Sequence, residues 1–391
     1  MANQDQKIKE ILERGVENIY PNKSALEKVL KSGNKLKIYN GIDPTGQLHI
    51  GHGVVLNKLR QFQEAGHEII VLIGDFTAMI GDPTDKLATR QPLTRQQVLA
   101  NAKGYKALIG KILDLKKTKF MFNSSWLAKL NFSDLLELAS EFTVQRLLER
   151  DMFAKRLKEG KVIHLHEFMY PVMQGYDCVA MDVDLEVGGS DQTYNMLAGR
   201  TLMKKLKNKE KFVLTTKLLE DTSGIKMGKT QGNMVSLGDD PQEIYGKVMS
   251  WTDGMIMPAF EIATDIPFDQ LPKLAADLRA GRNPKELKMI LARRLVAMYH
   301  GTKAADEAQQ QFEQVFAKKT NPDDIPEFKV KSKNLIDVLL ETKLADSRSE
   351  ARRLLSQSGI KVDGQKVSDE NFAVVKGVVI QKGKRHFVRI I

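Results

Sequence analysis

The stretch of sequence that decides the fold is residues 35–73, KLKIYNGIDPTGQLHIGHGVVLNKLRQFQEAGHEIIVLI. Residues 35–42 alternate between polar and apolar side chains and then reach a glycine, which indicates a β-strand. Residues 49–66 repeat apolar side chains at helical spacing, and residues 69–73 are all apolar. A strand, a helix and a strand with short connections form a βαβ unit. We therefore expect an α/β fold whose parallel sheet binds its ligand at the carboxyl ends of the strands.

The composition is that of a globular protein of two or three domains. The chain has 391 residues, of which 42% are hydrophobic and 28% charged, and this excludes a disordered or collagen-like chain. Apolar runs reach only about five residues, too few for a membrane span. Cys178 is the one cysteine, so an intrachain disulfide and a multi-cysteine zinc site are impossible. We expect a cytoplasmic protein that makes no membrane contact.

The loop after the first predicted strand, residues 41–53, has the features of a phosphate site. His49 and His52 stand three residues apart on the first turn of the predicted helix, and the N–H groups of a helix N-terminus bind anions. Gly51 and Gly53 let a ligand approach the backbone. Zinc binding is the second reading of a histidine pair, but a third ligand is missing nearby. A pair of surface histidines is the third reading, and the glycine-rich loop after a strand disfavours it.

A second glycine-bearing loop, residues 223–230, ends in Gly-Lys-Thr. A Walker phosphate loop needs glycine where Ser223 stands, and a strong helix does not follow. The segment therefore reads as a loop that carries two ammonium groups three residues apart. Taken alone, it would be read as a solvated surface loop.

Tyr170, Gln174 and Asp177 stand at positions i, i+4 and i+7, which is one face of a helix. Asp82 follows the second predicted strand, and a glycine-rich turn, residues 188–192, follows another strand. These polar groups suit a ligand site at the edge of a parallel sheet. The same helix face could equally be a satisfied buried network.

The charge of the chain points to a polyanionic partner. The net charge is +11, and residues 331–391 hold 13 Lys and Arg against 7 Asp and Glu. A polar stretch with two prolines precedes this basic tail and predicts a linker. The tail reads as helices followed by short strands: a hairpin at Asp363 and Gly364, a strand over 374–380 and another over 387–391. Its candidate phosphate-binding residues, for which a solvated surface is the other reading, are Arg348, Arg352, Arg353, Lys384 and Arg385.

Together these motifs resemble a known family. The segment His49-Ile50-Gly51-His52 matches the HIGH signature of class I aminoacyl-tRNA synthetases, and Lys226-Met227-Gly228-Lys229-Thr230 resembles their K-M-S-K-S signature. More narrowly, the chain resembles bacterial tyrosyl-tRNA synthetases over essentially its whole length. The further matches, in family order, are Gly41-x-Asp43-Pro44-Thr45, Gly81-Asp82-Pro83-Thr84, Tyr170-x-x-x-Gln174-x-x-Asp177 and Gly188-Gly189-Ser190-Asp191-Gln192.

The resemblance implies a role for each matching residue. Tyrosine would be bound by Tyr39, Asp82, Tyr170, Gln174, Asp177 and Gln192. ATP would be bound by Asp43, Thr45, His49, Gly51, His52, Asp191 and Lys229. The groups that would close on the leaving pyrophosphate are Lys86, Arg90, Lys226, Lys229 and Thr230. Within the tyrosine set, Tyr39 and Asp177 would contact the phenol hydroxyl, and Asp82, Tyr170 and Gln174 would hold the ammonium group. The second signature departs from the common form at Gly228, which lacks a hydroxyl, and at Thr230, which keeps one.

The implied reaction joins tyrosine to its tRNA. Tyrosine and ATP, the latter with Mg²⁺, give tyrosyl-adenylate and pyrophosphate, and tyrosine then passes to the 3′-terminal adenosine. The resemblance implies a cytoplasmic homodimer whose tRNA bridges both subunits, and no tightly bound protein metal. Two alternatives remain open: a tryptophanyl-tRNA synthetase, and a non-catalytic, synthetase-derived protein that binds structured RNA.

Four segments follow from the linker, the helical periodicity and the resemblance. We expect a Rossmann-like catalytic domain over residues 1–238, with an inserted region around 115–185 that the resemblance implies makes the dimer contact. A helical domain on the anticodon side is expected over residues 239–319, followed by a linker over 320–332. Residues 333–391 should form a small α+β RNA-binding domain similar to the ribosomal S-four type.

Overall fold

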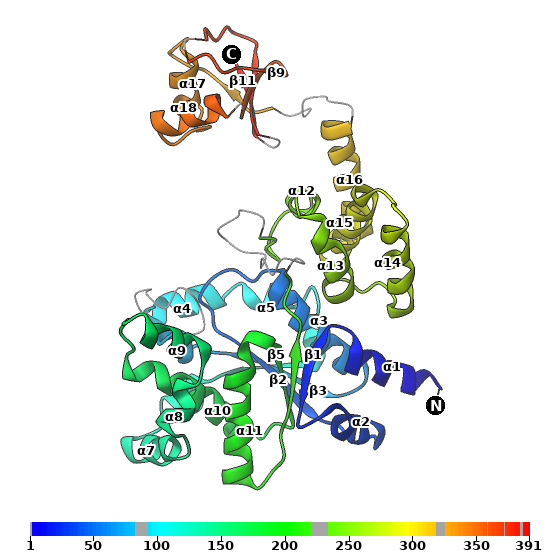
Figure 1. Cartoon of the computed structure of the whole chain (residues 1–391), viewed down its shortest axis with the longest axis vertical. Coiled ribbons are helices and arrows are strands. Elements are labelled where there is room, and N and C mark those ends of the chain that lie inside the picture. The colour runs from blue at the N-terminus through cyan, green and yellow to red at the C-terminus, as the bar shows by residue number, and fades with distance from the viewer. Residues whose placement is uncertain are drawn as a thin grey trace. The chain divides into compact units, whose positions relative to one another are not determined.

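The computed structural model describes residues 2–82, 93–220, 234–317, 325–357, 359–370, 372–383 and 386–391. The chain forms two compact units, Met1–Ala308 and Gln309–Ile391, and each has its own sheet and helices (Figure 1). None of the described helices combines the length and the apolar character that crossing a membrane requires.

A six-stranded sheet forms the centre of the first unit (Figure 1). Its strands lie in the order β1, β6, β5, β2, β3, β4, with bounds Val16–Tyr20, Phe212–Thr216, Leu185–Gly189, Lys37–Ile42, Glu68–Ile73 and Thr118–Phe122. Neighbouring strands are parallel except for β1 and β6. The expected parallel sheet is therefore confirmed. The chain builds outward from β2 to β3 and β4, then returns to β5 on the other side of β2, so the carboxyl ends of β2 and β5 flank the switch point where ligands of such sheets bind.

The expected strand–helix–strand unit is also confirmed, with narrower bounds. Strand β2 begins at Lys37, helix α3 spans Ile50–Glu64, and β3 follows. Leu56, Leu59 and Phe62 of α3 are fully buried. Burial of side chains of this size contributes about 1.5–3 kcal/mol each, which fixes α3 and the loop before it on the sheet.

Helices α10 (Met169–Met181) and α11 (Thr193–Lys207) pack against each other and close one part of the core. One apolar cluster joins Val172 of α10 and Leu202 of α11 to Tyr39 and Ile70 of the sheet. The helices approach closely at Gly175, where a Cβ atom would lie 2.9 Å from Leu202 Cδ1. This packing holds α10 beside the carboxyl ends of the strands.

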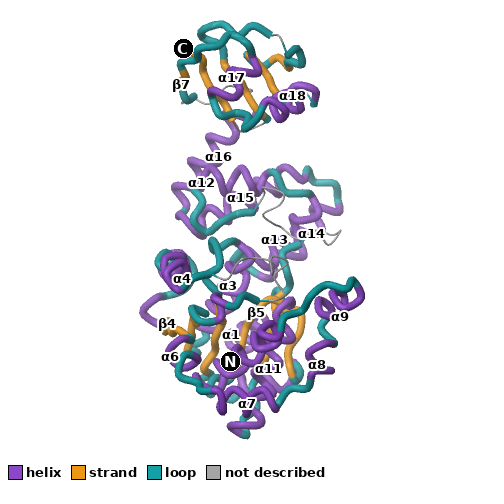
Figure 2. The backbone as a smooth tube through the Cα atoms, turned by 90° about the vertical axis from the view of Figure 1, so that its left-hand side faces the viewer, coloured by secondary structure: helices purple, strands orange, loops and turns teal. Residues whose placement is uncertain are grey.

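Of the other α-helices, those before residue 160 lie beside the sheet, whereas those after residue 240 gather at one end of it (Figure 2). The last of them, Thr302–Ala317, crosses from the first unit into the second. Before residue 160 they are α1 (Ala2–Glu13), α2 (Lys23–Lys31), α4 (Arg95–Ala102), α5 (Tyr105–Ile109), α6 (Ser124–Leu127), α7 (Phe132–Ser140), α8 (Val144–Leu148) and α9 (Asp151–Lys158). After the sheet come α12 (Pro241–Met249), α13 (Ile256–Ala263), α14 (Leu271–Arg279), α15 (Pro284–His300) and α16 (Thr302–Ala317). The segment expected to be helical is therefore helical where it is described, and its part up to Ala308 belongs to the first compact unit.

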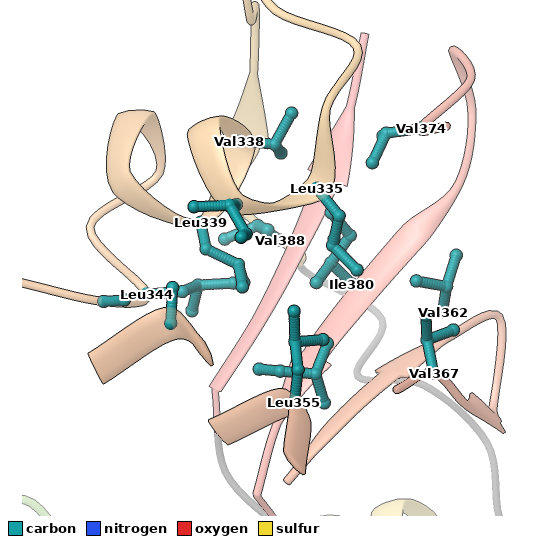
Figure 3. Close-up of a cluster of buried hydrophobic side chains, with 14 of the residues drawn as sticks. Leu335, Val338, Leu339, Leu344, Leu355, Val362, Val367, Val374, Ile380 and Val388 are labelled. Atoms are coloured by element: carbon teal, nitrogen blue, oxygen red, sulfur yellow. The ribbon is translucent and has the colours of Figure 1, made fainter. Parts of the chain in front are cut away.

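In its described residues, the second unit holds a five-stranded sheet, two whole helices and the end of α16. Its strands lie in the order β7, β11, β10, β8, β9, with bounds Glu327–Phe328, His386–Ile390, Val379–Lys382, Ile360–Val362 and Gln365–Lys366. Helices α17 (Leu335–Glu341) and α18 (Arg348–Ser356) bury Leu339 and Leu355 in the same cluster as Ile380 and Val388 (Figure 3). The predicted hairpin is confirmed: β8 and β9 pair around Asp363 and Gly364, whose φ angles are 46° and 82°.

One strand prediction in this unit is wrong at its start. Residues 374–380 were expected to be extended as a whole because they are mostly apolar, but β10 begins at Val379. Gly377 has a φ of 95°, and Val375 is 61% exposed. A turn therefore occupies the first half of the apolar run, and only the part that pairs with β8 and β11 is a strand.

Candidate functional site

Asp43, the residue directly after β2, anchors one side of the switch point. Its Oδ1 accepts a hydrogen bond from the Thr77 hydroxyl at 2.7 Å, and its Oδ2 accepts one from the Tyr170 hydroxyl at 2.9 Å. A Cβ atom at Gly74, the first residue after β3, would overlap Asp43 Oδ1 and Thr77 Oγ1. Glycine at position 74 therefore leaves room for Asp43 and Thr77 to approach each other. The hydrogen bond from Tyr170 holds α10 against the same carboxyl group.

Burial raises the pKa of Asp43 to about 7, although the hydrogen bonds from Thr77 and Tyr170 oppose the shift. Because this folded-state pKa lies above the unfolded value, the unfolded carboxyl ionises first as the pH rises, and the free energy of unfolding falls between about pH 4 and pH 7. We therefore expect Asp43→Asn, which carries no charge, to gain stability over the wild type with rising pH. The gain in melting temperature should be near zero at pH 4 and several degrees at pH 8.

Glu68→Gln is the matched control for this pH series, because its shift has the opposite sign. A hydrogen bond from Lys119 lowers the pKa of Glu68, so the carboxylate stabilises the fold above its unfolded pKa and loses that effect as the pH falls. The Glu68→Gln variant should melt below the wild type at pH 8 and approach it at low pH. A melting-temperature difference for Asp43→Asn that does not change with pH would contradict the burial argument.

The helix face expected from the spacing of Tyr170, Gln174 and Asp177 exists on α10, and each of the three side chains has a partner in the protein. Besides the Tyr170 contact, Gln174 Nε2 donates to Glu186 Oε1 of β5 at 2.9 Å. Asp177 is buried, and its two oxygens accept from Trp126 Nε1 at 2.7 Å and from Asn123 Nδ2 at 3.3 Å.

Tyr39 lies in β2 and is fully buried. Its hydroxyl is 3.0 Å from Cys178 Sγ, and Lys211 Nζ is 5.9 Å from the centre of its ring. Burial raises the pKa of Tyr39 well above its usual value, so the hydroxyl keeps its proton. Asp177, which directly precedes Cys178 in the sequence, is also buried, and burial raises its pKa well above the usual range.

Asp82 and Gln192, both in the expected tyrosine set, are brought together. Gln192 Nε2 donates to Asp82 Oδ2 at 2.7 Å, and Asn195 Nδ2 lies 3.5 Å from the same oxygen. Asp191 lies beside Gln192 in the short helical turn that follows β5. The loop after β3 and the loop after β5 therefore meet across the switch point.

The two histidines lie at the start of α3. His49 is its N-cap residue: His49 Nδ1 accepts from Gly51 N at 3.1 Å, and His52 Nδ1 accepts from His49 N at 3.2 Å. With Nδ1 accepting, a neutral imidazole carries its proton on Nε2. The ring centres are 4.1 Å apart. Thr45 lies just before this turn, and its backbone N–H donates to the Asp43 carbonyl at 2.8 Å.

Other expected residues are placed less fully. Those that lie outside the described residues are Lys86, Arg90, Lys226, Lys229, Thr230, Lys384 and Arg385. In the second unit, Arg348 pairs with Asp337 at 2.6 Å and Arg352 with Glu370 at 3.0 Å. Within the described ranges, no group of three or more His, Cys, Asp or Glu residues is arranged to hold a metal ion.

Several polar residues of the site were missed from the sequence. They contact the expected residues, and they are Asn123 directly after β4, Trp126 of α6, Glu186 of β5 and Lys211 directly before β6. Glu186 carried a usable signal, because a carboxylate in a buried strand must have a partner. Lys211 carried none, since its partner lies 25 residues away along the chain.

Comparison with known proteins gives consistent matches. The family model "tRNA synthetases class I (W and Y)" matches residues 31–317, and the "Tyrosine--tRNA ligase SYY-like C-terminal domain" matches residues 317–390. The tyrosine–tRNA ligase of Carboxydothermus hydrogenoformans is 45% identical over 98% of this chain and 97% of its own. Tyrosine–tRNA ligase 2 of Vibrio parahaemolyticus is 45% identical over 100% of this chain and 99% of its own.

Solved structures match the fold. A C-terminally truncated mitochondrial tyrosyl-tRNA synthetase of Coccidioides posadasii has a TM-score of 0.65 and 24% identity, and the match covers 79% of this chain and 94% of that one. The tyrosyl-tRNA synthetase of Archaeoglobus fulgidus, solved with L-tyrosine, has a TM-score of 0.62 and 24% identity over 78% of this chain and 99% of that one.

Proposed function

Because this chain belongs to the tyrosyl-tRNA synthetase family of class I aminoacyl-tRNA synthetases, we propose which of its residues carry each step of the family's reaction. The protein is a tyrosine–tRNA ligase, an enzyme that joins tyrosine to tRNA with the use of ATP. The observation that carries this conclusion is the 45% identity to tyrosine–tRNA ligases over nearly the whole chain.

The tyrosine side chain is proposed to enter between β2 and α10. Asp177 and Tyr39 bind its phenol hydroxyl, and the contacts of Asp177 with Trp126 and Asn123 support this role because they hold the carboxyl group in one orientation. Asp82, Tyr170 and Gln174 bind the ammonium group. Gln192 lies next to the carboxylate, where its contact with Asp82 orients it.

ATP is proposed to bind over the start of α3. One oxygen of the tyrosine carboxylate attacks the α-phosphorus, the acyl–phosphate bond forms, and the bond to pyrophosphate breaks. Charge builds on the phosphate oxygens, so positioned N–H and cationic donors carry the rate. His49 and His52 supply such donors through Nε2, Gly51 allows close approach, Asp43 and Asp191 border the nucleotide, and Thr45 lies near the terminal phosphates.

The segment over residues 223–230, which carries the second signature, completes the proposed ATP site. Lys226, Lys229 and Thr230, with Lys86 and Arg90, close on the pyrophosphate as it leaves. These five positions lie outside the described residues, so the proposal for them rests on the family signatures in the sequence. Mg²⁺ would arrive with the nucleotide and neutralise part of its phosphate charge.

The protein is proposed to act as a homodimer in the cytoplasm. Large apolar side chains are exposed on α7, α8 and the segment that follows α9: Phe132 is 75% exposed, Val144 59%, Val162 68% and Leu165 77%. Surfaces of this kind on a soluble protein mark contacts with another chain. A second copy of this chain fits the expected dimer-contact region, and sedimentation at micromolar concentration would report its mass.

The domain division is proposed as residues 1–238 for catalysis, 239–319 for the anticodon side, a linker over 320–332 and 333–391 for RNA binding. Strand β7, Glu327–Phe328, lies within the proposed linker and pairs with β11, so the end of that segment belongs to the sheet of the second unit. Removing the chain after Thr320 should leave tyrosyl-adenylate formation within about two-fold of the full-length rate, because the catalytic residues all precede it. Charging of tRNA should fall by about ten-fold or more, since the basic tail supplies phosphate contacts. Both rates are measured on the same preparation.

A point-mutant control tests the basic surface of the tail while the tail itself stays in place. In the full chain, Arg348, Arg352 and Arg353 are changed together to alanine, which removes three exposed cations of α18 and leaves its apolar face in place. This variant should reproduce part of the charging defect and weaken the salt dependence of tRNA binding. Equal charging by the truncated and full-length enzymes would remove the proposed RNA role of the tail.

ATP–pyrophosphate exchange, with tyrosine, tryptophan and phenylalanine supplied separately and without tRNA, tests the activity. Exchange with tyrosine alone is expected. Exchange with tryptophan would overturn the pocket assignment of Tyr39 and Asp177. Absence of exchange with all three, together with tRNA binding, would indicate an RNA-binding protein without catalysis.

A further inference from the structure

A buried ion pair, Lys211 with Glu186, contacts Gln174 and Tyr39 of the proposed tyrosine site and has no role in the assignments above. Lys211 Nζ contacts Glu186 Oε2, and the two side chains are 0% and 3% exposed. Lys211 also donates to the Met196 carbonyl at 3.0 Å. A buried ion pair gives little net stability, because the cost of removing both charges from water offsets their attraction. Its presence at this position therefore calls for another explanation.

The second oxygen of Glu186 determines the orientation of an amide. Glu186 Oε1 accepts from Gln174 Nε2 at 2.9 Å. A carboxylate can only accept, so the nitrogen end of the Gln174 amide must face it, and the flipped amide would bring two acceptors together. With Nε2 committed to Glu186, the Gln174 Oε1 atom is the acceptor that remains for a ligand. The Lys211 ammonium compensates the carboxylate charge that makes this selection possible.

The surrounding packing holds the arrangement tightly. A Cβ atom at Gly199 of α11 would overlap Cys178 Sγ and would lie 2.7 Å from Lys211 Nζ. Burial raises the pKa of the Cys178 thiol to about 12, so it stays neutral, and Sγ lies 3.6 Å from Glu186 Oε2. The same sulfur contacts the Tyr39 hydroxyl at 3.0 Å. One carboxylate thus contacts Gln174 directly and Tyr39 through the thiol.

A tyrosine ammonium group carries only donors, so a neighbouring amide helps it solely when the amide oxygen faces it. We propose that Glu186 and Lys211 are positioning residues for the amino acid substrate: together they hold Gln174 with its oxygen toward the ammonium group. This inference rests on the proposed role of Gln174 in ammonium binding. It predicts that the pair governs the KM for tyrosine and leaves the KM for ATP unchanged.

The test replaces both charges at once, so that no unpaired buried charge remains. In Glu186→Met with Lys211→Met, apolar side chains of similar length fill the space, and such exchanges are often neutral for stability. The KM for tyrosine in ATP–pyrophosphate exchange should rise by about ten-fold, which corresponds to one charge-assisted hydrogen bond. The KM for ATP should stay within two-fold. These constants do not depend on what fraction of a preparation is folded.

A rescue variant and a control pair make the result specific. Glu186→Gln with Lys211→Met returns an acceptor to Gln174 and should bring the KM for tyrosine back to within about three-fold of wild type. Glu68→Met with Lys119→Met removes an ion pair between β3 and β4, 2.7 Å long, and should change neither constant. The proposal fails if the apolar pair keeps the wild-type KM for tyrosine, if both KM values rise together, or if the rescue variant is no better than the apolar pair.

Gln174→Leu separates this proposal from the assignment beneath it. An unchanged KM for tyrosine in Gln174→Leu would remove the proposed role of Gln174 itself. A raised KM in Gln174→Leu with a normal KM in the apolar pair would defeat the positioning role alone. Should the apolar pair yield no folded enzyme, Glu186→Gln with Lys211→Gln decides, because it also leaves no unpaired buried charge. The amide at position 186 permits both orientations of Gln174, so a rise of about three-fold is expected, and an unchanged KM overturns the proposal.

Discussion

Replacing Asp177 with alanine should lower kcat/KM for tyrosine activation by about 100-fold or more, and should lower kcat/KM for phenylalanine far less. Asp177 is buried on α10, and Trp126 and Asn123 donate to its two oxygens. A phenol that enters this pocket loses its water and needs a partner, whereas the phenylalanine ring has no hydroxyl to satisfy. The variant therefore removes a contact that tyrosine alone makes.

The measurement is ATP–pyrophosphate exchange with each amino acid, and the quantity of interest is the ratio of the two kcat/KM values. The KM for ATP serves as the internal control, because Asp177 is proposed to contact tyrosine and not ATP. Asp184→Ala is a suitable external control: Asp184 is an acidic residue just before β5 that pairs with Lys209 at 2.8 Å. An unchanged preference for tyrosine over phenylalanine in Asp177→Ala would disprove the specificity role.

Features with local causes could be predicted from the sequence. The βαβ unit follows from apolar spacing in residues 35–73, and the shared face of Tyr170, Gln174 and Asp177 follows from the helical period. The hairpin at Asp363 and Gly364 follows from residues that tolerate a positive φ. Each of these rests on a few neighbouring residues whose geometry tertiary contacts do not alter.

Contacts between distant segments could not be predicted in the same way. The hydrogen bond from Tyr170 to Asp43 joins residues 127 positions apart, and it depends on the space left by Gly74. The spacing of the α10 face gave no indication of which partner each side chain would find. The start of β10 was predicted wrongly for a related reason. An apolar run forms a strand only where a neighbouring strand is present, and Val375 pairs with no described strand.

Each side chain of α10 that we propose to bind tyrosine is held by a second residue of the protein. Gln174, Asp177 and Tyr170 are each held by a second residue, namely Glu186, Trp126 and Asp43. Such second partners fix the orientation of a binding group before the ligand arrives, which reduces the ordering that binding requires. The histidines of α3 follow the same rule with backbone partners, which leads to the second large effect.

Replacing His52 with alanine should lower kcat for tyrosyl-adenylate formation by about 100- to 1000-fold, with little change in the dissociation constant of tyrosine. His52 Nδ1 accepts from His49 N, so in a neutral imidazole Nε2 is the nitrogen that carries the proton, and we propose that a phosphate oxygen of bound ATP accepts from it. That donor matters most when negative charge builds on the phosphate oxygens in the transition state. Single-turnover adenylate formation, with tyrosine binding measured separately, distinguishes kcat from binding.

Two amide variants separate the donor from the helix cap. Asparagine at position 52 places an oxygen near the Nδ1 position, so it keeps the contact with His49 N and loses the outer donor. Glutamine places an N–H near the Nε2 position and gives up the cap. If the N–H donor at the Nε2 position determines the rate, His52→Gln should be the faster enzyme and His52→Asn the more stable one. A His52→Asn enzyme with wild-type kcat would mean that His52 acts by capping α3 and not by contacting the phosphates.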